Sequence, residues 1–278
     1  MTTQMTSKPV ELARQVVEDV VAPLAVEIDR EKRFPEEAFK AFAETGLLGL
    51  LVPEEFGGLG GSLIDLAEVL ETIGQACGST AMCYLMHNCG TMMIVSRATP
   101  HQQEQYLKPI ARGEKIGTLA FSETGNGAHF YNPEIKGIKA GDHYILSGEK
   151  SFVTNGEKSD FMIVITNSAQ GDGLDMLIVD TVSAGIQFSG EWMGLGLRGN
   201  NSISLTMDQV QVPASNLIGQ EGEGQALIFE VVAPTFITGI SAVNVGLARG
   251  AYEAALNHAK SRKYANGQSL AHVPAIQY

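Results

Sequence analysis

Two short stretches decide the interpretation of this chain, SETGNG at Ser122–Gly127 and KSFVTNG at Lys150–Gly156. The sequence between them has the pattern of strands and turns. Each stretch places hydroxyl groups beside glycine or an aromatic ring, a mixture that can hold a flat ring with polar edges while the backbone comes close. Such a ring is typical of a flavin. Ordinary β-turns use the same residues, so the flanking sequence has to decide.

Further motifs flank these two stretches. Upstream, FP at Phe34–Pro35 precedes GLLGLLVPEEFGGLGG at Gly46–Gly61. Downstream, GLRGN covers Gly196–Asn200 and VPASNLIG covers Val212–Gly219. With these motifs in this order, from Phe34 to the last residue, the chain resembles the acyl-CoA dehydrogenase family. The resemblance favours the flavin interpretation over unrelated β-turns.

Hydrophobic periodicity predicts three blocks. From Val10 to about Gly113 the apolar residues recur at helical spacing. Within this block, Thr80–Ala98 is apolar on most sides, which predicts a buried helix. Short β-type runs broken by turns fill Gly117–Ile218, and helical spacing returns from Gly224. The methionines of the buried helix either fill the core or line a pliable acyl pocket: Met82, Met86, Met92 and Met93.

The individual elements follow from the same pattern. Ser62, with Asp65 three residues later, predicts a helix start with an N-terminal cap. The other predicted helices are Glu11–Ile28, Glu36–Thr45, His101–Arg112 and Ala242–Arg262. The predicted strands are Thr118–Phe121, Tyr144–Ser147, Phe161–Thr166, Met176–Asp180 and Ser202–Val212.

Together the blocks predict an α+β multidomain fold. We expect an N-terminal helical domain over 1–116, a middle antiparallel β-barrel or sandwich over 117–220, and the start of a C-terminal helical bundle over 221–278. The family's bundle has four helices, so the resemblance implies that a longer polypeptide or a partner chain supplies the remainder. Pro234 is expected to kink the long helix or to limit where it begins. The apolar face of residues 242–258 is expected to be exposed.

Composition and charge argue against several classes of function. A net charge of −12 argues against a nucleic-acid partner, whose binding depends on clustered Lys and Arg. The sequence has no apolar run of about 18 residues that would suggest a membrane span, and no secretory signal is visible. We therefore expect a cytoplasmic protein. Cys77, Cys83 and Cys89 lack the spacing of a zinc site, so we expect reduced thiols and no metal. His87 is expected to be a core histidine.

The resemblance implies a set of FAD-binding residues. Ser122 and Thr154 match residues at the edge of the flavin ring, and Phe152 stands where the family has a tryptophan against the ring face. Arg262 matches an arginine that reaches the cofactor pyrophosphate of a neighbouring subunit, which suits a bidentate guanidinium. A solvated cation at a helix C-terminus is the alternative for Arg262. The remaining matched positions are Leu119, Phe121, Gly127, Val153 and Ala128, the last of which replaces a serine.

The catalytic residues are unknown from the sequence. The family removes an α-proton from an acyl-CoA thioester with a carboxylate, which most members hold in a later part of the bundle. At the position that a minority use, this chain has Phe236, followed by Ile237 in place of an arginine. Glu230 is the nearest carboxylate, but it lies about two helical turns earlier and on a different face. We therefore expect little acyl-CoA dehydrogenase turnover from the 278 residues alone.

Three functions of different classes follow. The first is an FAD-dependent oxidoreductase of fatty acid metabolism, which introduces an α,β double bond into an acyl-CoA thioester and passes the electrons to an electron-transfer flavoprotein or a similar acceptor. The second is a non-catalytic or half-site subunit of a heteromeric complex of this family. The third is a flavin monooxygenase on the same scaffold. We expect a homo-oligomer, either a dimer or a homotetramer, or a hetero-oligomer.

Overall fold

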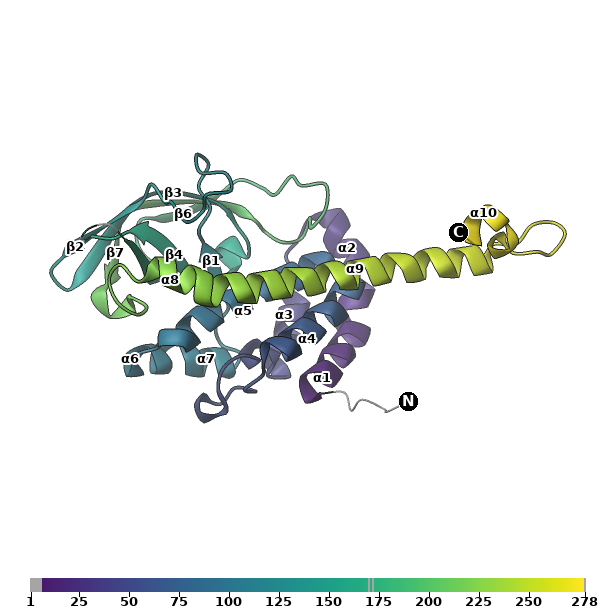
Figure 1. The fold of residues 1–278 in the computed structure, drawn as a ribbon, viewed down its shortest axis with the longest axis horizontal. Helices are drawn as coiled ribbons and strands as arrows, with labels where there is room; N and C mark the ends of the chain where they lie inside the picture. The colour runs from purple at the N-terminus through teal and green to yellow at the C-terminus, as the bar shows by residue number, and fades with distance from the viewer. Residues whose placement is uncertain (1–6, 170, 172, 278) are drawn as a thin grey trace.

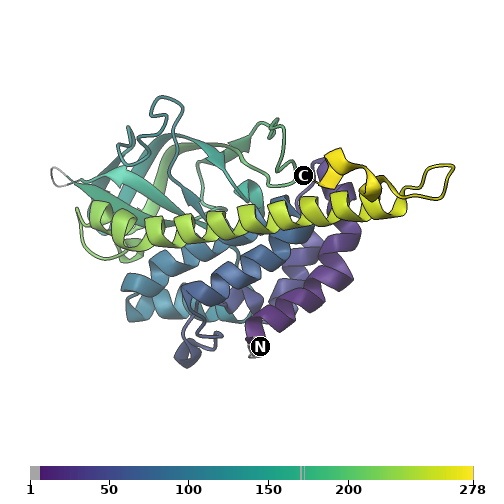
Figure 2. The ribbon, with the colours of Figure 1, turned by 45° about the vertical axis from the view of Figure 1, so that its right-hand side comes forward.

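The computed structural model describes residues 7–169, 171 and 173–277. A layer of helices from the first part of the chain lies against a curled β-sheet, and the long helix α9 (Ala233–Ser261) runs along the boundary between them (Figures 1 and 2). The far end of α9 extends beyond the body of the molecule and carries the C-terminal segment (Figure 1). The predicted α+β fold is confirmed.

The N-terminal helices follow the predicted periodicity. Helix α4 begins at the predicted cap, where Ser62 Oγ accepts the N–H of Asp65 at 3.2 Å and Asp65 Oδ2 accepts the N–H of Ser62 at 2.9 Å. The methionine-rich stretch forms the buried helix α5, as predicted. The helical segments of this part are α1 (Lys8–Val16), η1 (Val17–Val21), α2 (Ala22–Glu31), α3 (Glu36–Glu44), η2 (Leu47–Gly49), η3 (Glu54–Phe56), α4 (Leu63–Ala76), α5 (Gly78–Arg97), α6 (Pro100–Gln102), η4 (Gln103–Leu107) and α7 (Lys108–Ala111).

Three prolines lie within helical runs without ending them. Pro23, Pro109 and Pro234 each occupy the second position after a π-helical turn, in η1, η4 and η7 (Ile228–Val232) respectively. A π-turn shifts the hydrogen bonds to i→i+5, which accommodates a ring that has no N–H to donate. The helical path continues unbroken from α8 (Gly224–Leu227) through Pro234 into α9, so the expectation that Pro234 limits where the helix begins was wrong.

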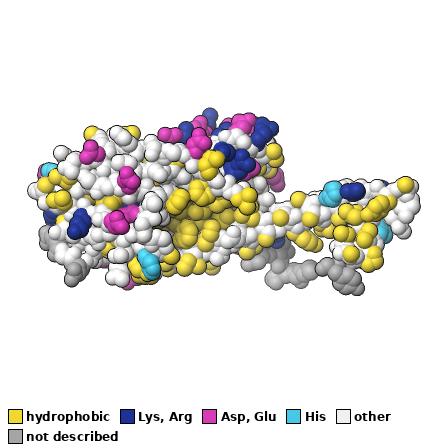
Figure 3. All heavy atoms as spheres, turned by 90° about the horizontal axis from the view of Figure 1, so that it is seen from above, with side chains coloured by type: hydrophobic (Ala, Val, Ile, Leu, Met, Phe, Trp, Pro, Cys, Tyr) yellow, Lys and Arg dark blue, Asp and Glu magenta, His cyan; other side chains and the backbone are white. Residues whose placement is uncertain are grey.

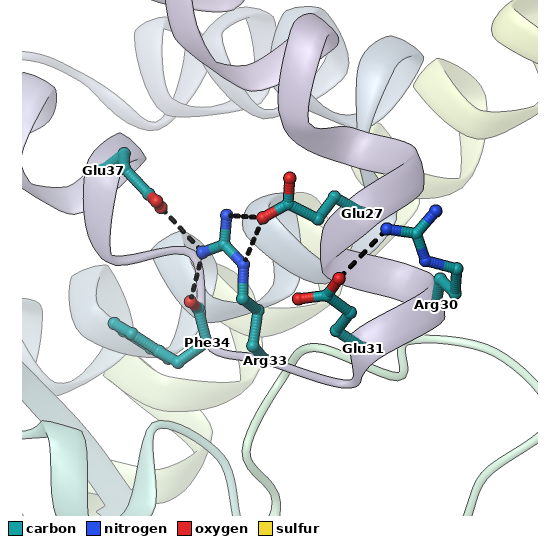
Figure 4. Close-up of polar contacts among 6 residues, drawn as sticks. All are labelled: Glu27, Arg30, Glu31, Arg33, Phe34 and Glu37. Carbon is teal, nitrogen blue, oxygen red and sulfur yellow. Dashed lines mark hydrogen bonds and ion pairs between the residues drawn. The ribbon is translucent and has the colours of Figure 1, made fainter.

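A guanidinium joins the end of α2 to α3. Arg33 donates to Glu27 Oε1 at 2.7 and 2.9 Å and to Glu37 Oε2 at 2.8 Å (Figure 4). The hydrogen bond from Arg33 lowers the pKa of Glu37. Lys32 precedes this residue in the left-handed region, with φ of 55°, and ends α2. The cluster connects α2 to α3 and adds little stability, because exposed ion pairs contribute about 1 kcal/mol or less.

Polar groups of α5 bind backbone atoms in the core. Tyr84 Oη donates to the Leu47 carbonyl at 2.6 Å, and His87 Nε2 lies 2.8 Å from the Leu48 carbonyl. His87 is fully buried, so the expectation of a core histidine is confirmed. The three cysteines are buried free thiols, which agrees with the expectation for them.

The middle part of the chain forms one curled sheet with the strand order β1-β4-β2-β3-β7-β6 and with β5 paired to β4. The predicted β-domain is confirmed, although the sheet is mixed rather than purely antiparallel, since β1 runs parallel to β4. The short strands β2 and β6 were not predicted: β2 is mostly exposed and lacks a clear apolar alternation, and β6 alternates over only four residues. The strands are β1 (Gly117–Ala120), β2 (Lys136–Ala140), β3 (His143–Val153), β4 (Phe161–Asn167), β5 (Leu174–Asp180), β6 (Ile186–Ser189) and β7 (Ile203–Pro213), and the short helices beside them are η5 (Gly156–Lys158) and η6 (Ala214–Asn216).

The sheet is buried on both faces at β4 and β5. Alternate residues such as Ile163 and Ile178 join the core of the helical layer, whereas their neighbours Val164 and Leu177 join a smaller cluster within the curl of the sheet. This explains why both strands read as continuous apolar runs in the sequence.

Helix α9 packs against α4 through glycines. A Cβ on Gly246 would lie 2.3 Å from the Glu71 carbonyl oxygen, and one on Gly74 would lie 2.9 Å from the Val243 carbonyl oxygen. The two backbones therefore approach too closely for any larger residue. The opposite face of α9 is exposed at Val245 and Tyr252, in agreement with the expected apolar face. After α9 come η8 (Leu270–His272) and α10 (Pro274–Gln277).

The continuous helix Gly224–Ser261 is long and apolar enough to cross a membrane by length and composition, with a mean hydropathy of 1.8 in its most apolar window. This amends the expectation that nothing suggests a membrane span, which was based on uninterrupted apolar runs. The core helix of a soluble protein meets the same criterion. The most apolar window of this helix is 39% buried, and the helix packs closely on α4 through its glycines.

Candidate functional site

A cavity of about 370 Å³ opens between α5, β1, β3 and the start of α9. Hydrophobic side chains gather in a hollow on the body of the molecule, beside the place where the long helix leaves it (Figure 3). All the residues that line the cavity are apolar except Ser122. They are Met86, Leu119, Phe121, Ser122, Phe130, Phe152, Val232, Ala233, Phe236 and Ile237.

Aromatic rings form two walls of this cavity. Phe121 and Phe130 stack with ring centroids 6.3 Å apart and an angle of 19° between their planes. Phe152 lines the cavity from β3. A site bounded by aromatic rings and almost free of polar groups suits a flat aromatic ligand.

Phe152 has an unusual backbone conformation. Its φ is 55°, in the left-handed region, and a β-bulge interrupts the pairing of β3 with β7 between Lys150 and Val153. The bulge turns the Phe152 side chain outward, so that it is 65% exposed while its neighbours Ser151 and Val153 are buried. A bulky residue in this conformation is strained, and such strain is common at functional sites.

A second cavity, of about 350 Å³, lies on another side of Phe152. Its lining includes Trp192, whose ring meets that of Phe152 edge to face with centroids 6.0 Å apart. Ser202 also lines this second cavity, and its Oγ lies 2.7 Å from Thr154 Oγ1. Phe152 therefore separates two hollows, and together they offer room for a ligand longer than one ring system.

The other residues matched to flavin contacts lie at different distances from the first cavity. Leu119 and Phe121 line it, and Val153 points instead into the small core cluster of the sheet. Gly127 and Ala128 lie on the exposed loop that follows Ser122. The loop thus presents its first residues and Phe130 to the cavity, and not Gly127 or Ala128.

Arg262 is remote from the cavity. It is exposed at the C-terminal cap of α9, 26 positions after Phe236, a span of about 39 Å along a helix. The described residues therefore do not bring Arg262 together with Ser122, Phe152 and Thr154.

No carboxylate is among the residues that line the first cavity. Phe236 and Ile237 both line it, which places the two departures from the family pattern at the cavity wall. Glu230 is exposed and forms an ion pair with Arg97, at 3.5 Å. Within the described residues, no group of three or more His, Cys, Asp or Glu side chains is placed to hold a metal ion.

A buried ion pair behind the cavity was missed at the sequence level. Lys150 Nζ donates to Glu123 Oε1 at 2.7 Å, and the side chains of both residues are almost completely buried. Burial lowers the pKa of Lys150 to about 8, while the hydrogen bond and charge of Glu123 act in the opposite direction. Both residues stand within the two stretches that indicated a flavin, which is the signal that could have revealed the pair.

Comparison with known proteins agrees with this architecture. Models of the acyl-CoA dehydrogenase N-terminal domain and middle domain match residues 5–114 and 118–210. A cyclohex-1-ene-1-carbonyl-CoA dehydrogenase of Syntrophus aciditrophicus is 34% identical over 96% of this chain and 65% of that protein. The probable acyl-CoA dehydrogenase YngJ of Bacillus subtilis is 33% identical over 98% of this chain and 73% of that protein. A chain in the solved structure of the electron transferring flavoprotein of Acidaminococcus fermentans superposes with a TM-score of 0.92 at 26% identity, covering 100% of this chain and 74% of that one.

The chain belongs to the acyl-CoA dehydrogenase family. It spans 65% and 73% of the lengths of the two relatives described above. Membership of this family implies FAD as the cofactor.

The residues present fit a flavin. Phe121, Phe130 and Phe152 supply flat apolar walls, and Ser122 supplies a polar group at the edge of the cavity. The hydroxyl of Ser151, next to Phe152, is buried and has no hydrogen-bond partner among the described residues. Ser151 is not among the lining residues of either cavity, so the fit depends on the aromatic walls and on Ser122.

Proposed function

We propose that this chain forms the FAD-binding part of an acyl-CoA dehydrogenase. FAD held in the cavity would supply the acceptor for a hydride from the β-carbon of an acyl-CoA thioester, while a base takes the α-proton, so that the thioester would gain an α,β double bond. The observation that carries the proposal is the juxtaposition of Ser122 and Phe152 across one aromatic-walled cavity, with Thr154 two residues beyond Phe152.

Each residue of the site has a defined role in this proposal. Ser122 would hydrogen-bond the polar edge of the ring, Phe152 would cover one face, and Phe121 and Leu119 would complete the wall. Thr154 lines neither cavity and pairs with Ser202, so it would have to turn its hydroxyl toward the ring edge. The N–H groups of Gly127 and Ala128, on the exposed loop, would be available to the cofactor phosphates. The apolar lining excludes water, which strengthens every hydrogen bond made inside the cavity.

The acyl chain lies against α5 and the start of α9 in this proposal. Met86 and Phe236 line the cavity from these two helices. Met93 is fully buried and serves the core. The unbranched, flexible side chain of Met86 suits a wall that adapts to its ligand.

The carboxylate base comes, in this proposal, from a further chain segment or a partner subunit that completes the cavity beside Ile237. Ile237 is 61% exposed although it lines the cavity, so this side is open to such a contribution. The same opening would admit the acceptor of the electrons, for which we propose an electron-transfer flavoprotein. The Acidaminococcus chain with the same fold comes from a structure of an electron transferring flavoprotein, which supports this choice.

One observation favours a second candidate function. Phe236 and Ile237 make the cavity wall apolar at the two positions where a minority of the family have the carboxylate base and an arginine. A half-site subunit, which binds flavin or acyl-CoA only in a heteromeric complex, would show this wall. Copurification with a second chain of the same family would support that candidate.

The setting of the protein is also part of the proposal. We propose a soluble cytoplasmic protein of fatty acid metabolism that forms a homotetramer or a dimer, with Arg262 reaching the cofactor of a neighbouring subunit. The proposal also keeps the three domains expected from the sequence, with bounds at 1–116, 117–220 and 221–278. The exposure of Val245 and Tyr252 on α9 supports an assembly in which this face is covered.

Turnover measurements test the function. The purified 278-residue chain, loaded with FAD, is assayed with acyl-CoA esters of several chain lengths and an artificial electron acceptor. We expect flavin binding with little or no turnover, because a general base contributes about 10²- to 10⁴-fold and none lines the cavity. Robust turnover by this chain alone would show that the base has been misassigned.

A further inference from the structure

The ammonium group of Lys150 connects three segments behind the cavity. It donates to Glu123 Oε1 at 2.7 Å, to the Ile165 carbonyl of β4 at 2.8 Å and to the Phe121 carbonyl at the end of β1 at 3.4 Å. All three donors of the ammonium group are therefore used. The contacts join β3, β4 and the start of the loop that follows β1.

The carboxylate of Glu123 closes the base of that loop. Its Oε2 accepts the N–H of Glu134 at 2.7 Å and the side-chain amide of Asn126 at 3.0 Å. Residues 123 and 134 are thereby held together, whereas the loop between them is largely exposed. The position of Ser122 then depends on this carboxylate.

The two residues of the pair are close in sequence to two residues that line the cavity. Glu123 directly follows Ser122, and Lys150 stands two positions before Phe152. The N–H of Ser151 donates to the Ser122 carbonyl at 2.8 Å, so the backbones on the two sides also touch. Moving the ion pair would therefore move both walls.

Stability alone gives a weak reason for burying these charges. Replacing a buried ion pair by apolar residues of similar size is often neutral or stabilising, because burial removes both charges from water. We propose that Glu123 and Lys150 are a positioning pair, which sets the separation between Ser122 and Phe152 and so prepares the site for the flavin ring. This inference rests on the flavin site of the proposed function.

A double variant tests the pair. Glu123→Met with Lys150→Met removes both charges and keeps two long apolar side chains. Lys158→Met is the matched control, since it breaks an ion pair of the same 2.7 Å length, with Glu36, at the surface. Glu123→Gln is a milder second variant, because its single carbonyl oxygen cannot accept from three donors at once.

Three readouts separate a positioning role from a structural one. FAD affinity is measured by fluorescence titration, and thermal unfolding reports stability. The emission of Trp192, the one tryptophan of the chain, reports the position of Phe152, which its ring contacts.

The positioning role predicts a double variant that unfolds within a few degrees of the unmodified chain. It also predicts FAD binding weakened about tenfold or more and a shifted Trp192 emission, with Glu123→Gln changed in the same direction and Lys158→Met unchanged. Unaltered FAD affinity and emission in the folded double variant would overturn the inference. It would also be overturned if both variants failed to fold, because the pair would then serve folding. If the unmodified chain failed to bind FAD, the proposed function would fall, while the Trp192 emission would still decide whether the pair positions Phe152.

Discussion

The backbone N–H of Gly117 donates to Nδ1 of His87 at 3.0 Å, which ties the first strand of the sheet to the buried helix α5. Because Nδ1 accepts this bond, the proton of the neutral ring is on Nε2, which donates to the Leu48 carbonyl at 2.8 Å. A single imidazole therefore connects α5, β1 and the turn after α3. The ring therefore fixes the position of the helical layer relative to the first strand of the sheet.

This histidine makes stability depend on pH. Burial lowers the pKa of His87 to about 4 in the folded chain, below the value of about 6.5 expected when unfolded. Its contribution is complete above pH 6.5 and is lost as the pH falls toward 4, with a slope of at most about 1.4 kcal/mol per pH unit. Urea unfolding between pH 7 and pH 4.5 should show a smaller loss for His87→Gln than for the unmodified chain. Equal slopes in the two proteins would contradict this assignment.

Thr154 is expected to hydrogen-bond the flavin. Thr154→Val keeps the shape but removes the hydroxyl that pairs with Ser202, which should weaken FAD binding by about 1 to 3 kcal/mol. Ser202→Ala removes the other member of the same hydrogen bond and should have a smaller effect on affinity. If both substitutions changed FAD binding equally, or neither changed it, Thr154 would be a structural residue only.

Phe152 should show opposite effects on stability and on binding. Asparagine tolerates the left-handed conformation better than phenylalanine. Phe152→Asn should therefore leave the free energy of unfolding unchanged or raise it by up to about 1 kcal/mol. The same substitution removes an aromatic wall of the cavity and should weaken FAD binding. Calorimetry and FAD titration of one preparation measure both effects. A marked loss of stability with unchanged affinity would refute the prediction.

Gly246 permits the close contact between α9 and α4. Gly246→Ala would place a methyl group 2.3 Å from the Glu71 carbonyl oxygen, so we expect a loss of about 1 to 3 kcal/mol in unfolding free energy. Asn244→Ala, on the exposed side of the same helix, is the control and should change stability little. If the glycine variant were as stable as the control, the two helices would not be packed as the structure shows them.

Periodicity predicted the major helices and strands because each buries one face in a regular pattern. It failed where the backbone departs from regular geometry. Simple alternation along β3 would place Lys150, Phe152 and Thr154 on the same face, yet the bulge and the positive φ expose Phe152 while Lys150 and Thr154 are buried. A bulge depends on pairing with β7, a strand some fifty residues later, which local sequence does not encode.

The assignment of the flavin-contact residues stays a prediction. Motif resemblance located Ser122, Phe121 and Phe152, which do line one cavity. It did not indicate that Lys150 is buried, because a lysine between a glutamate and a serine in a strand usually faces solvent. The pairing with Glu123 depends on the fold of the loop, which brings together residues 27 positions apart.

Equilibrium binding of FAD to the purified, flavin-free chain tests the central claim most directly. Titration followed by flavin fluorescence and visible absorbance should give saturable binding of one FAD per chain. Thr154→Val and Phe152→Asn should weaken it, and the surface variant Lys158→Met should not. The absence of saturable binding, or equal affinity in all four proteins, would contradict the assignment of the cavity between Ser122 and Phe152 as the flavin site.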